Sequence, residues 1–247
     1  MLFNVTILFL TALLAGMAVF FIPRFDQSRF KVALSFSGAY LFSITVIHII
    51  PELFQEAPDI RHAGIFVLVG FFMQMILEFF TTGVEHGHLH HHNHAPGHTA
   101  HVPYAIFASL FVHAFLEGTL LVHPSHNHGH DDGNTLLYGL VIHKIPEAFA
   151  LMFVLLFRLR SKTKAFVLLV LFALASPAGL LVSDVLHHGN FISENVFIML
   201  FAIVAGNFLY ISTTIFFENS PEHKFKASKL SVSLLGAAMA ILAEYML

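Results

Sequence analysis

The sequence predicts an all-α membrane protein with eight transmembrane helices and both termini outside. Three observations support this prediction. The 247 residues are 57% hydrophobic and only 11% charged, and the mean hydropathy is +0.77, which is typical of a polytopic membrane protein. The apolar residues gather in long runs, and the basic residues fall on alternate connections between those runs.

Each of the eight apolar runs is long enough to cross a bilayer, which takes roughly 20 residues. Proline and glycine inside a run do not argue against a helix, because membrane helices tolerate both. We therefore expect residues 1–247 to form a single transmembrane domain. The runs are 2–22, 32–56, 63–84, 103–123, 135–157, 164–186, 191–217 and 229–247.

The charge pattern predicts the orientation of the runs. Of the twelve Lys and Arg residues, ten lie in or beside the odd-numbered connections. Arg61 alone lies in an even-numbered connection, and Lys144 lies within the fifth run. Because basic loops stay in the cytoplasm, we expect the odd-numbered connections to be cytoplasmic. Eight spans then leave both termini outside.

Three apolar runs carry a His and a Glu four residues apart, a spacing that places both side chains on one face of a helix. Ionisable groups at membrane depth are costly and mark a functional site by default. Imidazole and carboxylate together suit zinc, iron(II), manganese or cobalt. The chain has no Cys, so a metal site must use nitrogen and oxygen ligands. The three pairs are His113 and Glu117, His143 and Glu147, and His48 and Glu52.

We expect the pairs of the fourth and fifth runs to converge on one ion with two nitrogen and two oxygen ligands. These residues are His113, Glu117, His143 and Glu147. The alternative is that each His bonds its own Glu or nearby backbone as a structural link.

Lys144 lies within the fifth run, next to His143. A buried Lys needs carboxylate partners or it loses its proton. Adjacent helical residues point about 100° apart, so Lys144 is expected at a neighbouring polar position. Two residues further on, Pro146 leaves the carbonyl of Ile142 without its helical hydrogen bond, and that carbonyl can face a polar cavity.

Other polar residues in the runs are candidates for a pathway or secondary role. The pair in the second run lies near its outer end and suggests metal access. The polar candidates in the sixth and seventh runs lie among small residues. The alternative explanation for these two segments is close helix packing. The candidates are His48, Glu52, Lys144, Glu78, Ser176 and Asn207.

Most of the nineteen histidines lie in two connections. The loop at 85–102 is expected to be cytoplasmic and the loop at 123–134 extracytoplasmic. His-rich tracts of this kind bind metals, which suggests metal capture, and the alternative is a spacer without a binding role. The residues assigned to capture are His86, His88, His90, His91, His92, His94, His126, His128 and His130.

These motifs resemble those of the ZIP (zinc/iron permease, Zrt/Irt-like) transporters along nearly the whole chain. The matching features are H-x-x-P-E in the second span, HAFLEG in the fourth, HKIPEA in the fifth, AGNFLY in the seventh and the His-rich loop after the third. The resemblance implies a ZIP-like bundle built around spans 2, 4, 5 and 7 and alternating access. It also implies a primary metal site at the four residues of spans 4 and 5, and a further ligand near Tyr40.

The chain departs from the family at three positions that help hold a second, adjacent metal in many members. Ala114 stands where many members have Asn, Lys144 where many have Asp or Asn, and Ser176 where many have Glu. We therefore predict a single transport metal. The Lys144 ammonium would replace the second ion and pair with Glu117 or Glu147.

The sequence thus predicts a divalent metal transporter and not an enzyme. The resemblance implies uptake into the cytoplasm, of zinc or else of iron, manganese or cadmium, and the expected location is a bacterial inner (plasma) membrane. Metal ions and the lipid bilayer are the expected partners, the resemblance also implies a homodimer, and no nucleic acid is expected. One alternative is a cation-diffusion-facilitator-like exporter, although those proteins usually have six spans. The other is an intramembrane metal-dependent hydrolase with Glu117 as general base, although no H-E-x-x-H motif is present.

Overall fold

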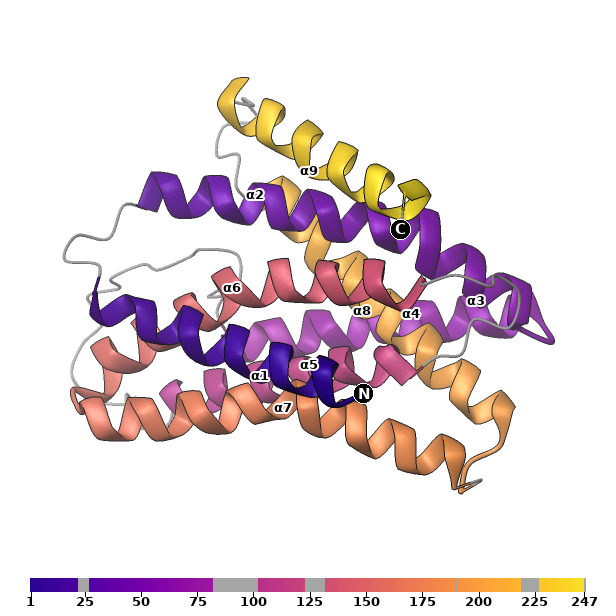
Figure 1. Ribbon diagram of the computed structural model, residues 1–247, viewed down its shortest axis with the longest axis horizontal. Helices are drawn as coiled ribbons and strands as arrows, with labels where there is room; N and C mark the ends of the chain where they lie inside the picture. Colours follow the sequence, from indigo (N-terminus) through magenta and orange to yellow (C-terminus); the bar gives the residue numbers. More distant parts are fainter. Residues whose placement is uncertain (22–26, 82–101, 123–131, 190, 219–226, 247) are drawn as a thin grey trace.

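The computed structural model describes residues 1–21, 27–81, 102–122, 132–189, 191–218 and 227–246. The regular elements within these ranges are all helical, and the long helices lie roughly side by side as one bundle, with both termini in the same half (Figure 1). The long helices are α1 (Leu2–Met17), α2 (Gln27–Ile44), α4 (Ile60–Thr81), α5 (Val102–Thr119), α6 (Asp132–Leu159), α7 (Lys162–His188), α8 (Glu194–Glu218) and α9 (Ala227–Met246). The short elements are η1 (Ala18–Phe20), η2 (Thr45–Ile49), α3 (Ile50–Glu56) and η4 (Leu120–Val122).

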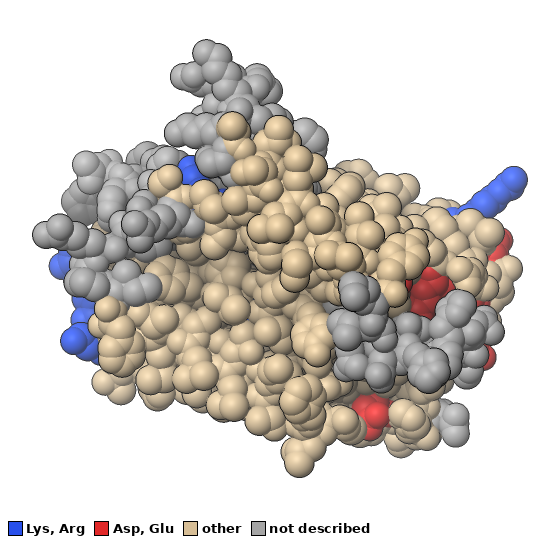
Figure 2. Space-filling view, turned by 45° about the horizontal axis from the view of Figure 1, so that its top comes forward, with Lys and Arg blue, Asp and Glu red and all other residues tan. Residues whose placement is uncertain are grey.

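Within the described ranges, seven helical segments are long and apolar enough to cross a membrane, and they correspond to the first seven apolar runs. The eighth run forms α9, which is not among those seven, so its membrane crossing stays a prediction. Large apolar side chains of α9, such as Leu234 and Leu242, are exposed, as a lipid-facing helix requires. Figure 2 shows Lys and Arg mainly at one end and Asp and Glu at the other, with a broad uncharged band between them.

The second span is not a continuous α-helix. It passes from α2 through the π-helical turn η2 into α3, which begins just before Pro51. Proline has no backbone N–H to donate to the preceding turn, which accounts for the locally widened helix. Such single π turns occur frequently at functional sites, and this one contains His48.

The helices pack as two groups. In one group, α4 packs most extensively against α8 and α2 against α9; in the other, α5 packs against α7 and α1 against α6 and α7. Glycines allow the closest approaches, since a Cβ at Gly70 would collide with the carbonyl of Ile203, and one at Gly179 with that of Phe115. Small residues bring helices this close in lipid. The groups meet where α2 contacts α6 and α4 contacts α5.

Two glycines of α4 test this packing. We expect Gly70→Ala to lower the unfolding temperature, because a backbone carbonyl cannot move aside, and overpacking of this kind costs about 1–3 kcal/mol. Gly64 has open space where its Cβ would be, so Gly64→Ala should leave stability unchanged or raise it. Thermal unfolding of both variants in detergent micelles provides the comparison. Equal unfolding temperatures for the two variants would contradict the packing.

Candidate metal site

The fourth and fifth spans bring their His and Glu pairs together. On α5 and on α6, the four-residue spacing places each pair on one helix face. One donor atom from each of His113, Glu117, His143 and Glu147 lies within 4.8 Å of the others. Each of the four residues is 1% exposed or less. The arrangement that the sequence predicts for these four residues is therefore present in the structure, deep inside the bundle.

The distances between donor atoms suit a shared ion. His113 Nε2 lies 3.0 Å from Glu117 Oε1 and 3.9 Å from Glu147 Oε1, and His143 Nε2 lies 3.7 Å from Glu117 Oε1. Two ligand atoms on a tetrahedral zinc ion stand about 3.4 Å apart, given bonds of about 2.0–2.1 Å. Two imidazole nitrogens and two carboxylate oxygens at these separations fit a divalent first-row ion.

Lys144 contacts the two carboxylates on the side away from the histidines. Its Nζ donates a hydrogen bond to Glu117 Oε2 and another, of 2.7 Å, to Glu147 Oε2. Each carboxylate therefore directs Oε1 towards the histidines and Oε2 towards the ammonium. The Nζ also lies 5.3 Å from the ring centroid of Phe172, a cation–π distance. The sequence predicts a bond from Lys144 to one Glu or the other, and the structure shows both.

Ser37, on α2, forms a hydrogen bond with His143 on α6. Its Oγ on α2 lies 3.2 Å from His143 Nδ1, and both residues are buried. A bond at Nδ1 orients the ring so that Nε2 faces the carboxylates. No sequence motif predicts this role for Ser37, because Ser37 lies 106 residues from His143 and shares no motif with it. Tyr40, the position that the family resemblance indicates, lies about one helical turn further along α2.

Of the secondary candidates, Lys144 contacts this cluster directly, and the others are not among its ligand groups. Ser176 Oγ donates to the carbonyl of Ala114 at 2.8 Å, which joins α7 to α5 and fits the packing explanation. Asn207 is fully buried in α8, and Glu78 is half-buried in α4.

The pair in the second span forms a separate cluster with α9. His48 Nδ1 lies 3.0 Å from Glu244 Oε1, and His48 Nε2 lies 3.6 Å from Glu52 Oε2. Glu244 has no sequence motif that connects it to His48, which lies 196 residues earlier.

The histidines assigned to metal capture lie outside the described residues. They are His86, His88, His90, His91, His92, His94, His126, His128 and His130.

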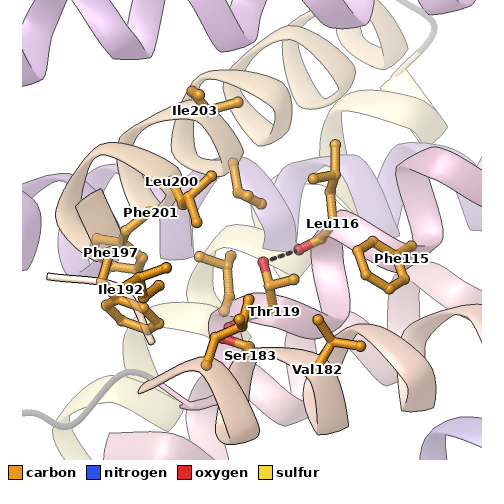
Figure 3. Close-up of a pocket in the computed structure, with 13 residues that line it drawn as sticks. Phe115, Leu116, Thr119, Val182, Ser183, Ile192, Phe197, Leu200, Phe201 and Ile203 are labelled. Carbon is orange, nitrogen blue, oxygen red and sulfur yellow. Dashed lines mark hydrogen bonds between the residues drawn. The ribbon is translucent and has the colours of Figure 1, made fainter. Parts of the chain in front are cut away.

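A pocket of about 120 Å³ between α5, α7 and α8 differs from the candidate metal site in having a mainly apolar lining (Figure 3). Its lining contains no His and no carboxylate. The hydroxyl of Thr119 donates to the carbonyl of Leu116 at 2.6 Å, and that of Ser183 to the carbonyl of Thr119 at 3.1 Å. These hydroxyls bond backbone within the protein, so the pocket is an apolar space and not a second metal site.

Comparison with known proteins agrees with this geometry. A family model described as ZIP Zinc transporter matches residues 101–243, which include both His and Glu pairs of α5 and α6. No curated protein matches the chain closely enough to count as a relative. The family match covers more than half of the 247 residues, and with the seven apolar helices it identifies a multi-pass membrane protein that belongs to the ZIP zinc transporter family.

Proposed function

We propose that this protein takes up zinc, or a related divalent ion, into the cytoplasm through the site between α5 and α6. Membership of the ZIP family supports the transport of divalent metals. The convergence of four buried donor atoms from two helices is the observation that carries the proposal. His113, Glu117, His143 and Glu147 would bind the ion, and Ser37 would orient one imidazole. A hydrolase is less compatible with this geometry, because Glu117, its candidate base, is bonded to Lys144.

We propose that one ion is carried at a time. A neighbouring second ion would need the Oε2 atoms of Glu117 and Glu147, and both accept hydrogen bonds from Lys144. The ammonium is a fixed positive charge in a site of low dielectric, where it would strongly repel a divalent ion beside it. The ammonium also offsets one of the two carboxylate charges, so the site carries less negative charge when no metal is bound.

We propose that movement between the two helix groups changes access to the site. All four ligands belong to the group of α1, α5, α6 and α7, whereas Ser37 belongs to the group of α2, α4, α8 and α9. A relative shift of the groups would carry the ligands as a unit, as alternating access requires. The Ser37–His143 hydrogen bond would then persist in only some of the states.

We propose a bacterial inner membrane as the location and cytoplasmic uptake as the direction. Ten of the twelve basic residues lie at the predicted cytoplasmic connections, and the uneven ends in Figure 2 support this orientation. A homodimer is part of the same proposal and derives from the family resemblance.

Uptake into proteoliposomes tests the function, with zinc, cadmium, iron(II) and manganese offered in turn. We expect uptake by the wild type and a loss of more than about 100-fold in His143→Ala/Glu147→Ala, since even indirect partners of a metal contribute 10- to 100-fold. Ser43→Ala is the control, because this buried serine bonds only backbone of its own helix, at Ala39. A wild type that binds metal stoichiometrically and transports none would refute the proposal.

Lys144→Asp tests the single-ion proposal. Aspartate would remove the ammonium, release two carboxylate oxygens and add a ligand. We therefore expect one additional cadmium ion per chain in equilibrium dialysis, relative to wild type. Lys162→Asp makes the same charge change at an exposed position and controls for electrostatic attraction alone. An unchanged cadmium count in Lys144→Asp would contradict the proposal.

A further inference from the structure

Away from the central site, the end of the second span carries a second set of metal-binding groups. We propose that His48 Nε2 and Glu52 Oε2 bind a divalent metal ion at a loading site, with Glu244 as the residue that orients His48. The proposal rests on the proposed transport function and adds to it the place where the ion first binds.

The separation of the two donor atoms favours a metal over a direct hydrogen bond. His48 Nε2 and Glu52 Oε2 are 3.6 Å apart, which exceeds the 2.7–3.2 Å of an ordinary hydrogen bond. It is close to the spacing of about 3.4 Å between two ligands of a tetrahedral zinc ion. The backbone supports this geometry, since His48 lies in the π turn and Glu52 in α3 immediately after it.

Glu244 supplies the partner that a metal-binding histidine usually has. Its Oε1 lies 3.0 Å from His48 Nδ1. A proton on Nδ1, donated to this carboxylate, leaves the lone pair of Nε2 directed at Glu52. Carboxylate–histidine–metal arrangements of this kind fix the tautomer and the ring orientation and raise the basicity of the ligand. Glu244 comes from α9, so the arrangement exists only in the folded bundle.

Exposure distinguishes this cluster from the central site. The side chains of His48, Glu52 and Glu244 are 11%, 17% and 22% exposed, whereas those of the four central residues are 2% exposed or less. His48 lies eleven residues beyond Ser37, which corresponds to roughly 16 Å along the helix axis. The cluster lies near the end of α9 and the C-terminus (Figure 1), at the predicted outer end of the span.

The charge and the small number of these ligands also suit a site that binds an ion and then releases it. Two carboxylates attract a cation to the end of the second span. Only two protein ligands hold the ion, so water would complete its coordination and release would be easy. Conduction requires binding that is favourable enough for the ion to enter and weak enough for it to leave.

Zinc uptake kinetics of the full-length protein test the proposal. Glu52→Gln removes a ligand and leaves the His48–Glu244 contact in place, so we expect the KM to rise about tenfold and Vmax to be largely retained. A KM change of this type reports lost binding rather than a lost transport step. Glu52→His replaces one metal ligand with another and should restore a low KM.

Asp59→Asn is the matched control. Asp59 is exposed near the same end of the span, and its pKa lies below the usual carboxyl value because the side chain of His62 and the backbone amides of Arg61 and His62 donate to it. It therefore carries the negative charge that the variant removes, while Asn still caps α4. The KM of this variant should equal that of wild type.

Cadmium binding gives a second readout that does not need transport. In the His143→Ala/Glu147→Ala background, adding Glu52→Gln should remove one equivalent of bound cadmium. An unchanged KM and an unchanged cadmium count would overturn the proposal. A fall in Vmax without a change in KM, or no rescue by Glu52→His, would also overturn it and make the cluster a structural link to α9. Failure of the wild type to transport any metal would instead refute the proposed function.

Discussion

The ammonium of Lys144 between Glu117 and Glu147 is the interaction on which the rest of the site depends. Burying any one of these three charged side chains alone would cost too much free energy. Their burial together is tolerable because the opposite charges compensate one another. The two oxygens of each carboxylate therefore have different partners. One accepts a hydrogen bond from Lys144, and the other is directed at the histidines. The proposed metal site is therefore organised by a fixed internal cation.

The site lies in a bundle that consists of two closely packed helix groups. Close glycine contacts bind α5 to α7 and α4 to α8, so each helix group can keep its own packing. The proposed metal ligands belong to one group, and Ser37 reaches one of them, His143, from the other. This division suits the alternating access that we propose.

Local periodicity made much of this predictable. The His–x–x–x–Glu spacing on α5 and α6 places donor atoms on one helix face, and the cost of burying Lys144 requires carboxylate partners nearby. Ser37 and Glu244 were not predictable, because each meets its histidine across more than 100 residues and through helix packing that no local pattern specifies. The π turn at His48 also escaped prediction, although Pro51 was a visible cause. For the run that forms α9, the membrane crossing stays a prediction.

The most direct test of this account is a crystal structure with bound cadmium, located by its anomalous scattering. We predict one cadmium ion among His113, Glu117, His143 and Glu147, with the Lys144 ammonium still bonded to the far oxygens of both carboxylates. Two adjacent cadmium ions in this site, or a cadmium ion in the place of a displaced Lys144 side chain, would contradict the account.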